Sequence, residues 1–581
     1  MMRLKGRLAH KFAESPLLLL RLPAWRSRLL ALLILGAFAL LIGRAFYLQV
    51  LNNDFLQEKG DSRYRRDLEI SASRGRIADR NGDVLAVSTP MKSVWAIPAD
   101  AKLTPEQTQQ LARLLEANPK DLSRKLASEK SFVYLHRQIP PEVAEKIAAL
   151  KLPGVGQNTE YRRYYPTGEM TAHLVGFTGI DDKGLEGVEL AFQKQLLGRP
   201  GSRSVIKDRR GQIVEDVGSI RPPQDGQDIR LSLDSKIQYL AYSQLKQAVA
   251  ESQAKAGGVA VVDARTGEVL ALANWPTYNP NNRESLSGAQ LRNRAVTDAF
   301  EPGSTLKPFT VALALEKGKV RFDTVIDCAP GRMTIGTATI NDAHSHGPLT
   351  VAEVIQKSSN VGAAKIAAML APQEMWEMFD AVGFGQVPEL GFPGEVSGRL
   401  RPWKHWRPIE QATMSYGHGI SVSLIQLIHA YTVFAREGEL IPLSLTRLEA
   451  PPPKGAMIYS PQTVREVVAM LEMAVRPGGT APKAQIPGYR VAGKTGTAHK
   501  LEDGVYAKRY VASFVGLAPA SAPRLIVAVM IDEPSAGRHF GGDVAGPVFA
   551  SVMAGALRTL GVPPDSPLQV VANAPVAKES L

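Results

Sequence analysis

The stretch FEPGSTLKPFT, residues 300–310, decides the fold and the chemistry that we expect of this chain of 581 residues. Pro302-Gly303 is a turn signal, and an apolar helical pattern follows from Thr305 to Lys317. Ser304 lies where this helix starts and Lys307 follows three residues later, so both side chains share one face of a helical turn. Backbone N–H groups and the positive end of the helix dipole stabilise a developing oxyanion at such a serine. The segment therefore predicts a nucleophilic serine with a lysine beside it.

A lysine can serve as the general base only if its pKa is strongly lowered. At the reference pKa of about 10.4, roughly 0.04% of Lys307 would be neutral at pH 7. Its pKa must therefore fall by about three units, and burial or a neighbouring positive charge can cause this. We expect Lys307 to be buried near a second cation. Three other Ser-x-x-Lys patterns lie in polar or amphipathic stretches where we expect solvated side chains, at Ser204, Ser243 and Ser252.

Two further motifs follow in order along the chain. Ser358-Ser359-Asn360 lies 54 residues after Ser304, and its hydroxyl and amide could relay a proton and hold a substrate carbonyl. Alone, the motif is more typical of a helix cap, because residues 361–370 have a helical pattern. Lys494-Thr495-Gly496-Thr497 lies in a β-rich run, where Gly496 lets a ligand approach the strand and Lys494 supplies a permanent positive charge. Taken alone, the pattern favours an exposed lysine on an edge strand. Together the three motifs indicate a serine acyl-transfer site.

The pattern of elements around these motifs predicts a layered α/β or α+β domain. Residues 257–273 read as two strands joined at Arg265-Thr266-Gly267. A mostly helical stretch runs to about residue 475, and three β-rich runs follow at 489–498, 510–517 and 524–531. Strands, then helices, then strands indicate one antiparallel sheet covered by helices.

The N-terminal part carries a membrane signal. Residues 1–28 contain seven Lys and Arg against one Glu, about half of the net charge of +13, and the rest of the chain has no basic stripe. Nucleic acid is therefore disfavoured as a partner. An apolar run from Leu29 to Leu48 is long enough to cross a bilayer, and the basic head keeps the N-terminus in the cytoplasm. A cleaved signal peptide is the alternative, but its small-x-small site at Ala37-Phe38-Ala39 lies inside the apolar run.

Several longer stretches resemble one family. The motif series is typical of penicillin-binding proteins and serine β-lactamases, and the chain resembles class B penicillin-binding proteins of the cell-division type, also called penicillin-binding protein 3. Beyond the motifs, the resemblance covers three stretches of a non-catalytic pedestal and three of a transpeptidase domain: residues 74–88, 164–179, 184–189, 300–309, 416–427 and 540–549.

The resemblance implies a layout of five segments. They are a cytoplasmic basic segment (1–28), a transmembrane anchor (29–50), an elongated mixed α/β pedestal or dimerisation-type domain (51–221), the transpeptidase domain (222–561) and a disordered tail (562–581). The turn signals Pro222-Pro223 and Asp225-Gly226 mark the main boundary. Within the pedestal we expect a turn at Asn81-Gly82 and amphipathic helices over 103–150 with breaks at Pro140 and Pro141.

The resemblance also implies the reaction and its residues. Ser304 would attack the D-alanyl-D-alanine bond of a peptidoglycan stem peptide and release D-alanine, and an amine of a neighbouring stem would capture the acyl-enzyme. Lys307 would be the base, Ser358 the proton relay and Asn360 a substrate-amide partner. Lys494 would assist them and bind the terminal carboxylate with Thr495 and Thr497, and Gly496 and Phe540 would also contact the substrate. The N–H groups of Ser304 and Thr497 would form the oxyanion hole. The family needs no metal or cofactor, and β-lactams acylate the same serine.

The family setting is a bacterial inner membrane with the catalytic domain in the periplasm, beside a separate membrane glycosyltransferase and other division proteins. A serine β-lactamase would be about half this length. An elongation-type transpeptidase remains the nearest alternative, and a non-catalytic scaffold or β-lactam sensor comes from another class.

A few positions depart from the family or invite other readings. Ser423-Leu424 replaces a Thr-Pro pair, and His539-Phe540 replaces an aromatic pair, which affects the expected pocket wall. Cys328, the single cysteine, is expected to be buried, and His344 and His346 to lie in a solvated loop rather than a metal site. We expect Lys508 and Arg509 to be surface charges, with carboxylate binding as the alternative.

Overall fold

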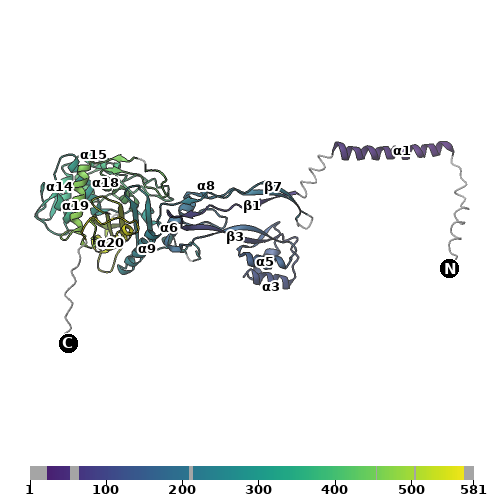
Figure 1. Cartoon of the computed structure of the whole chain (residues 1–581), viewed down its shortest axis with the longest axis horizontal. Helices are drawn as coiled ribbons and strands as arrows, with labels where there is room; N and C mark the ends of the chain where they lie inside the picture. The colour runs from purple at the N-terminus through teal and green to yellow at the C-terminus, as the bar shows by residue number, and fades with distance from the viewer. Residues whose placement is uncertain are drawn as a thin grey trace, which may run out of the picture.

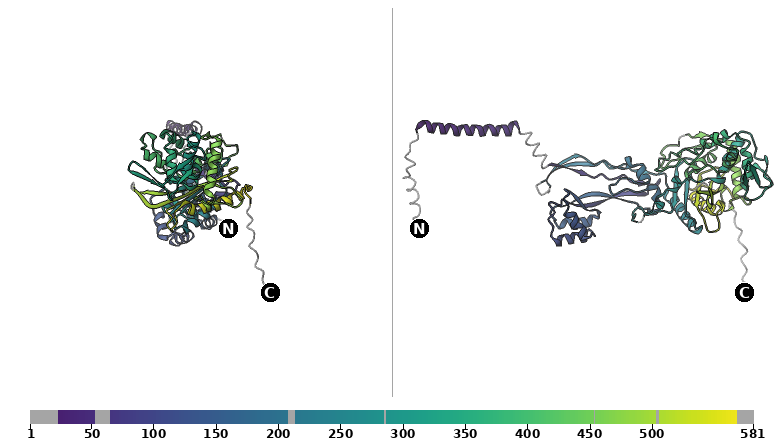
Figure 2. Two further views of the ribbon diagram at one scale, coloured as in Figure 1. Left: turned by 90° about the vertical axis from the view of Figure 1, so that its left-hand side faces the viewer. Right: turned by 180° about the vertical axis from the view of Figure 1, so that it is seen from behind.

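The computed structural model describes residues 23–52, 65–207, 213–284, 286–452, 454–502 and 505–567. Figure 1 shows a long N-terminal helix, an extended part built of long strands, and a globular C-terminal domain. Figure 2 shows the same strands from behind, leading to the globular domain from a small helical head, residues 105–149.

The N-terminal helix is long and apolar enough to cross a membrane. Helix α1 spans Ala24–Phe46 and continues as a π-helix, η2, over Tyr47–Leu51. The two together have a mean hydropathy of 2.4 in their most apolar window, and none of that window is buried in the protein. This confirms the predicted apolar helix, which starts five residues earlier than Leu29 because Trp25, Arg26 and Arg28 continue the same helix. The remaining basic residues, 1–22, lie outside the described part of the chain.

Two sheets build the pedestal. Strands β1 (Arg65–Ile70), β6 (Gly201–Lys207) and β7 (Ile213–Arg221) form one antiparallel sheet. The other sheet contains β2 (Ile77–Ala78), β3 (Val84–Ala96), β4 (Val133–Ile139), β5 (Val155–Tyr164) and β8 (Ile229–Arg230). Asn81-Gly82 lies between β2 and β3, as predicted, and Gly82 has a φ of 99°. Strand β8 follows the turn signals at 222–226 and still pairs with β2.

The helical head differs in part from the predicted pattern. Helices α3 (Pro105–Leu114), α4 (Pro119–Leu126) and α5 (Pro141–Ala149) form it. Strand β4 interrupts the stretch that was expected to be helical. Pro140 and Pro141 begin α5 rather than break a helix, because proline tolerates the first helical turn, where its missing N–H costs nothing.

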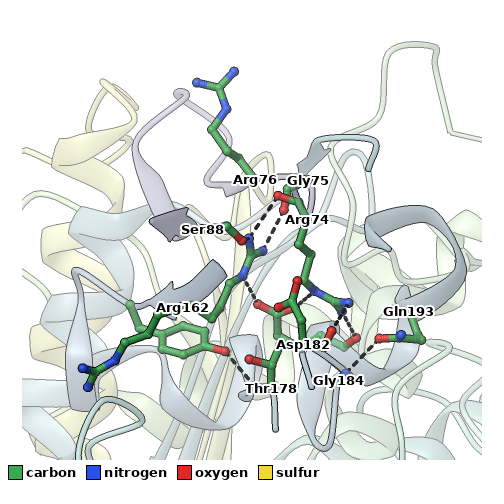
Figure 3. Close-up of polar contacts among 12 residues, drawn as sticks. Arg74, Gly75, Arg76, Ser88, Arg162, Thr178, Asp182, Gly184 and Gln193 are labelled. Carbon is green, nitrogen blue, oxygen red and sulfur yellow. Dashed lines mark hydrogen bonds and ion pairs between the residues drawn. The ribbon is translucent and has the colours of Figure 1, made fainter. Parts of the chain in front are cut away.

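A buried charge cluster joins distant parts of the pedestal (Figure 3). Glu189 accepts hydrogen bonds from Nε of Arg74 and Nε of Arg163, both at 2.6 Å, and all three side chains are at most 1% exposed. Arg163 also donates to the carbonyl of Gly75 at 2.7 Å and to the hydroxyl of Ser88 at 3.0 Å. Buried charges are tolerated only when they are paired and hydrogen-bonded in this way. Glu189 lies on α7 (Gly187–Ala191), one of four short helices that follow β5 in the chain. The others are η3 (Gly168–Met170), α6 (Ala172–Val175) and α8 (Gln193–Leu196).

The C-terminal domain contains the predicted antiparallel sheet. Its order is β10 (Val269–Trp275), β9 (Ala256–Asp263), β19 (Leu525–Asp532), β18 (Val505–Ala518) and β17 (Ala492–Glu502), so β17 is an edge strand. Alternate residues of the central strands enter different cores. Val259 and Val527 lie in the core with α9 (Ser235–Glu251) and α20 (Gly541–Thr559), whereas Ala260 and Ile526 face the other helices. The period of two is the reason that one sheet can be covered on both faces.

A large group of helices covers the second face of this sheet and carries the site. It comprises α11 (Arg294–Thr297), η4 (Gly303–Leu306), α12 (Lys307–Glu316), α13 (Val351–Lys357), α14 (Asn360–Ala367), α15 (Pro372–Ala381), α16 (Pro408–Met414), α17 (Leu424–Ala430), α18 (Thr432–Ala435) and α19 (Pro461–Val475), with α10 (Gly288–Leu291) and η5 (Trp403–His405) as short turns. The short turn η6 (Pro482–Ala484) contacts α20 instead. The expectation of a mostly helical stretch was incomplete, because short strand pairs interrupt it. They are β11 (Val325–Asp327) with β14 (Pro348–Thr350), β12 (Arg332–Ile335) with β13 (Ala338–Asn341), and β15 (Glu439–Leu440) with β16 (Ala456–Met457).

Two smaller expectations also need correction. Ser204 and Ser252 are 1% and 7% exposed, so they are buried rather than solvated. The segment expected to be disordered from residue 562 onward begins with ordered contacts. Asp565 accepts from the backbone N–H of Arg490 at 2.7 Å and from the hydroxyl of Ser521 at 2.6 Å. Residues 568–581 lie outside the described part.

Candidate active site

Ser304 and Lys307 lie on consecutive turns at the start of the first long helix of the helical group. Ser304 belongs to the 3-10 turn η4, and Lys307 is the first residue of α12. Nζ of Lys307 lies 2.9 Å from Oγ of Ser304. The lysine is 0% exposed, as expected of a lysine that must lose its proton. The local spacing therefore brings the predicted nucleophile and base into direct contact.

The second motif reaches the same lysine. Nζ of Lys307 donates to the carbonyl of Ser358 at 2.5 Å and to Oδ1 of Asn360 at 2.8 Å, and lies 3.1 Å from Oγ of Ser358. Ser358 has a left-handed backbone with a φ of 61°, in the sharp connection between α13 and α14. Ser359 caps α14, since its Oγ accepts from the N–H of Gly362 at 2.9 Å. Capping and contact with Lys307 are thus divided between two adjacent serines.

Asp342 fixes this motif, and sequence reasoning missed that role. Its carboxylate accepts from the hydroxyl of Ser359 at 2.7 Å and from the N–H groups of Asn360 and Val361 at 2.5 and 2.9 Å. A negative charge is favourable at the N-terminus of a helix such as α14. In the sequence, Asp342 stands out only as an acid near His344, and no spacing rule links it to residues 358–360.

The third motif completes a chain of hydrogen bonds. Nζ of Lys494 lies 2.9 Å from Oγ of Ser358, so this hydroxyl lies between the side-chain nitrogens of two lysines. Lys494 is 0% exposed, so the alternative of an exposed edge-strand lysine is wrong. Its charge is not permanent either, because burial lowers its pKa to about 7.

The surroundings of Lys307 lower its pKa, as its role as the base requires. Burial, and after it the positive charge of Lys494, hold the pKa of Lys307 well below its ordinary value, while the charge of Asp342 acts in the opposite direction. Both causes that the sequence argument required, burial and a second cation, are present.

Strand β17 points its alternate residues in two directions. Lys494 contacts Ser358, whereas Thr495 shares a hydrogen bond with Thr480 at 3.1 Å, and Oγ1 of Thr497 accepts from the N–H of Gly541 at 3.0 Å. The backbone also needs glycine at position 496 because other parts of the protein approach it closely.

A Cβ on Gly496 would lie 2.3 Å from Oγ of Ser513 and 2.7 Å from the carbonyl of Pro302. The turn that carries Ser304, and not only a ligand, therefore approaches this strand closely. A Cβ on Gly303 would in turn lie 3.4 Å from the nitrogen of Thr497. The two segments whose N–H groups are predicted to form the oxyanion hole thus lie side by side.

Aromatic rings surround the site. The ring of Tyr416 lies 6.0 Å from Nζ of Lys307. The ring of His539 stacks on that of Tyr510, with 4.1 Å between the ring centroids. Its centroid lies 4.5 Å from that of Phe540, a side chain that is 53% exposed. His539 therefore continues the aromatic wall at the position where the sequence departs from the family.

The other departure does not affect the wall. Ser423 and Leu424 are both 0% exposed, and Ser423 caps α17. The doubt that these two residues raised about the pocket wall was therefore misplaced, because they belong to the core.

The remaining candidates take ordinary places. Cys328 is buried, as predicted, and burial raises the pKa of its thiol. Over the described residues, no group of three or more His, Cys, Asp or Glu side chains could hold a metal ion, and His344 is exposed. Lys508 is exposed, and Arg509 lies 3.5 Å from Glu533.

Comparisons with known proteins agree with this fold and site. Residues 257–554 match the penicillin-binding protein transpeptidase domain, and residues 69–231 match the penicillin-binding protein dimerisation domain. The chain therefore belongs to the transpeptidase family of penicillin-binding proteins, with the pedestal that defines its class B members.

Named relatives cover almost the whole chain. It is 46% identical to a probable peptidoglycan D,D-transpeptidase, PenA, of Neisseria gonorrhoeae, over 92% of this chain and 93% of the relative. It is 43% identical to the peptidoglycan D,D-transpeptidase FtsI of Escherichia coli K12, over 94% of this chain and 93% of that relative. The solved transpeptidase domain of penicillin-binding protein 3 from Burkholderia pseudomallei is 52% identical, with a TM-score of 0.54, and covers 58% of this chain and 98% of that domain.

Proposed function

We propose that this protein is a septal peptidoglycan D,D-transpeptidase that cross-links stem peptides during bacterial cell division through an acyl-enzyme on Ser304. The observation that carries the proposal is the hydrogen-bond chain from Ser304 through Lys307 and Ser358 to Lys494, with steps of 2.9, 3.1 and 2.9 Å. Relatives over nine-tenths of the chain are named as peptidoglycan D,D-transpeptidases.

The steps of acylation follow from these hydrogen bonds. Neutral Lys307 takes the proton of Ser304 as Oγ attacks the carbonyl carbon between the two D-alanines. The N–H groups of Ser304 and Thr497 receive the oxyanion. Ser358 passes a proton to the leaving D-alanine nitrogen, the C–N bond breaks, and D-alanine leaves. Acylation by a β-lactam uses the same steps, but the cleaved ring stays attached.

The other motif residues hold the substrate. Asn360, whose Oδ1 lies 2.8 Å from Lys307 and whose Nδ2 donates to the carbonyl of Asn341 at 2.9 Å, is rigid enough to orient a substrate amide. Protonated Lys494 and the hydroxyls of Thr495 and Thr497 bind the terminal carboxylate, and exposed Phe540 borders the substrate. A carboxylate beside Lys494 would raise its pKa and keep it charged.

The rest of the molecule suits a membrane-bound enzyme. Helix α1 anchors the chain in the bacterial inner membrane with its basic N-terminus in the cytoplasm and the catalytic domain in the periplasm. The predicted layout of anchor, pedestal (51–221) and transpeptidase domain (222–561) places the site far from the bilayer. A separate membrane glycosyltransferase supplies the glycan strands, and the pedestal contacts other division proteins.

The test is covalent labelling of the full-length protein in detergent. Incubation with benzylpenicillin should give one stable adduct by intact mass, mapped to Ser304 and absent from Ser304→Ala. Rapid drug turnover without an adduct would indicate a β-lactamase. Neither adduct nor turnover would leave a non-catalytic scaffold and contradict the proposal.

A further inference from the structure

Glu301, in the turn before Ser304, has a carboxylate that the proposed steps leave unused. Its Oε1 accepts from the N–H of Gly419 at 2.8 Å and from the hydroxyl of Tyr506 at 3.1 Å. Its Oε2 is buried and has no hydrogen-bond partner among the described residues. A buried acceptor without a donor costs free energy, so such an atom requires an explanation.

The position of Glu301 links it to the reaction. Two residues separate it from Ser304, so their Cα atoms are at most about 11 Å apart. Gly419, its backbone partner, belongs to the same loop as Tyr416, whose ring lies 6.0 Å from Nζ of Lys307. Glu301 therefore joins the turn that carries Ser304 to the loop that carries Tyr416, a neighbour of Lys307.

The charges of the site create a need that Glu301 can meet. The acceptor of a transpeptidase is an amine, and a primary amine with a pKa near 10 is protonated at neutral pH. Protonated Lys494 gives the site a positive character, which suits the carboxylate of the donor but repels a second cation. Asp342 also acts on the charge of Lys307, but both of its oxygens already accept hydrogen bonds from α14 and its cap, so Asp342 is not the group that receives an acceptor amine.

We propose that Glu301 binds the protonated amine of the acceptor peptide and takes its first proton. This inference rests on the proposed function, since it requires an acyl-enzyme on Ser304. The ammonium group replaces the hydroxyl of Tyr506 at Oε1 and supplies the donor that Oε2 lacks. Tyr506 is 48% exposed, so its ring can be displaced toward solvent.

The step balances as follows. The acceptor enters as an ammonium ion and gives one proton to the carboxylate of Glu301. The neutral nitrogen attacks the ester carbonyl, a C–N bond forms, and the bond to Oγ of Ser304 breaks. The second proton of the amine goes to Oγ, which regenerates the serine, and Glu301 releases its proton to water.

The experiment measures how the acyl-enzyme divides between acceptors. Full-length wild-type and Glu301→Gln proteins in detergent receive a thiolester donor that mimics the D-alanyl-D-alanine end, together with D-lysine or methanol. The ratio of transfer to hydrolysis does not depend on how fast the acyl-enzyme forms. We expect Glu301→Gln to reduce the D-lysine ratio at least tenfold and the methanol ratio less than twofold, because methanol carries no charge.

Two control variants sharpen the test. Glu437→Gln removes an exposed carboxylate remote from the motif residues in sequence, and its ratios should match the wild type. Tyr506→Phe removes the hydroxyl that competes for Oε1 of Glu301. The D-lysine concentration that gives half of the maximal transfer ratio should therefore be unchanged or lower.

An unchanged D-lysine ratio in Glu301→Gln, or equal losses with D-lysine and methanol, would overturn the inference. A loss in Tyr506→Phe as large as in Glu301→Gln would assign acceptor binding to the phenol and overturn it too. Failure of the wild type to form any acyl-enzyme would instead refute the proposed function.

Discussion

One hydroxyl is shared by two buried lysines in this site, and the protonation of each lysine depends on the other. Oγ of Ser358 lies 3.1 Å from Nζ of Lys307 and 2.9 Å from Nζ of Lys494. Two ammonium ions this close would repel strongly in a buried site. The charge of Lys494 therefore helps to keep Lys307 neutral, and a substrate carboxylate helps to keep Lys494 charged.

The pH dependence of acylation should report Lys494. Its pKa of about 7 in the free protein means that it is charged below pH 7 and loses the charge as pH rises. Binding of the benzylpenicillin carboxylate should therefore weaken above pH 7, and the second-order acylation constant should fall by up to about tenfold per pH unit. Stopped-flow labelling of the full-length protein measures it.

The methyl ester of benzylpenicillin is the matched control, since it has no carboxylate for Lys494 to bind. Its slower acylation should not fall across the same pH range. A parallel fall for acid and ester would show that another group titrates.

Replacing Ser358 should affect the reaction more than the fold. Ser358→Ala removes the hydroxyl between the two lysines, and loss of a proton relay typically costs 10² to 10⁴ in rate. The neighbouring variant Ser359→Ala removes a helix cap and should instead cost about 1 kcal/mol of stability, with less than a tenfold loss in rate. Labelling kinetics and thermal unfolding of both variants separate the proton-relay role of Ser358 from the capping role of Ser359. Equal losses of rate and stability in the two variants would contradict this division of roles.

At the level of elements, the turn η4 and strand β17 hold the nucleophile against the sheet edge. Their contact depends on Gly496, where a Cβ would lie 2.7 Å from the carbonyl of Pro302. Helix α14 is held independently by Asp342 and Ser359. The site is therefore assembled from elements that are each fixed by their own backbone contacts.

Gly496→Ala should destabilise the domain by about 1 to 3 kcal/mol, because overpacking forces either β17 or η4 to move. The melting temperature should fall by several degrees, and acylation should slow because Ser304 shifts from the strand. Gly288→Ala is the control, since a Cβ there meets nothing within 4 Å. Equal melting temperatures for Gly496→Ala and the wild type would show that the backbone adjusts freely.

At the level of the whole molecule, the pedestal depends on the buried cluster of Figure 3. Glu189 pairs with Arg74 before β2 and with Arg163 on β5, residues that are far apart in sequence. Removal of one partner from a buried pair leaves uncompensated charge and typically costs 3 to 5 kcal/mol.

We therefore expect Glu189→Ala to lower the unfolding temperature of the pedestal clearly, measured by calorimetry of the full-length protein. Asp228→Asn is the matched control, because its pair with Arg76 is more than half exposed and should contribute about 1 kcal/mol or less. Similar effects of the two changes would mean that the buried cluster adds little net stability.

The sequence alone determined a large share of this description. The three motifs, the apolar helix, the hairpin turns at 81–82 and 265–267 and the individual strands of the sheet all depend on neighbours a few residues away or on simple periodicity. The contact between Ser304 and Lys307 is of this kind, because one helical turn dictates it.

Only the tertiary structure decided the chemistry of the other groups. Lys494 lies 136 residues after Ser358, and its burial and lowered pKa arise where β17 meets the helical group. Asp342 and Glu301 also gain their partners from distant segments. A pKa depends on every charge and dipole that packing brings within a few ångströms, and local sequence patterns do not record those neighbours.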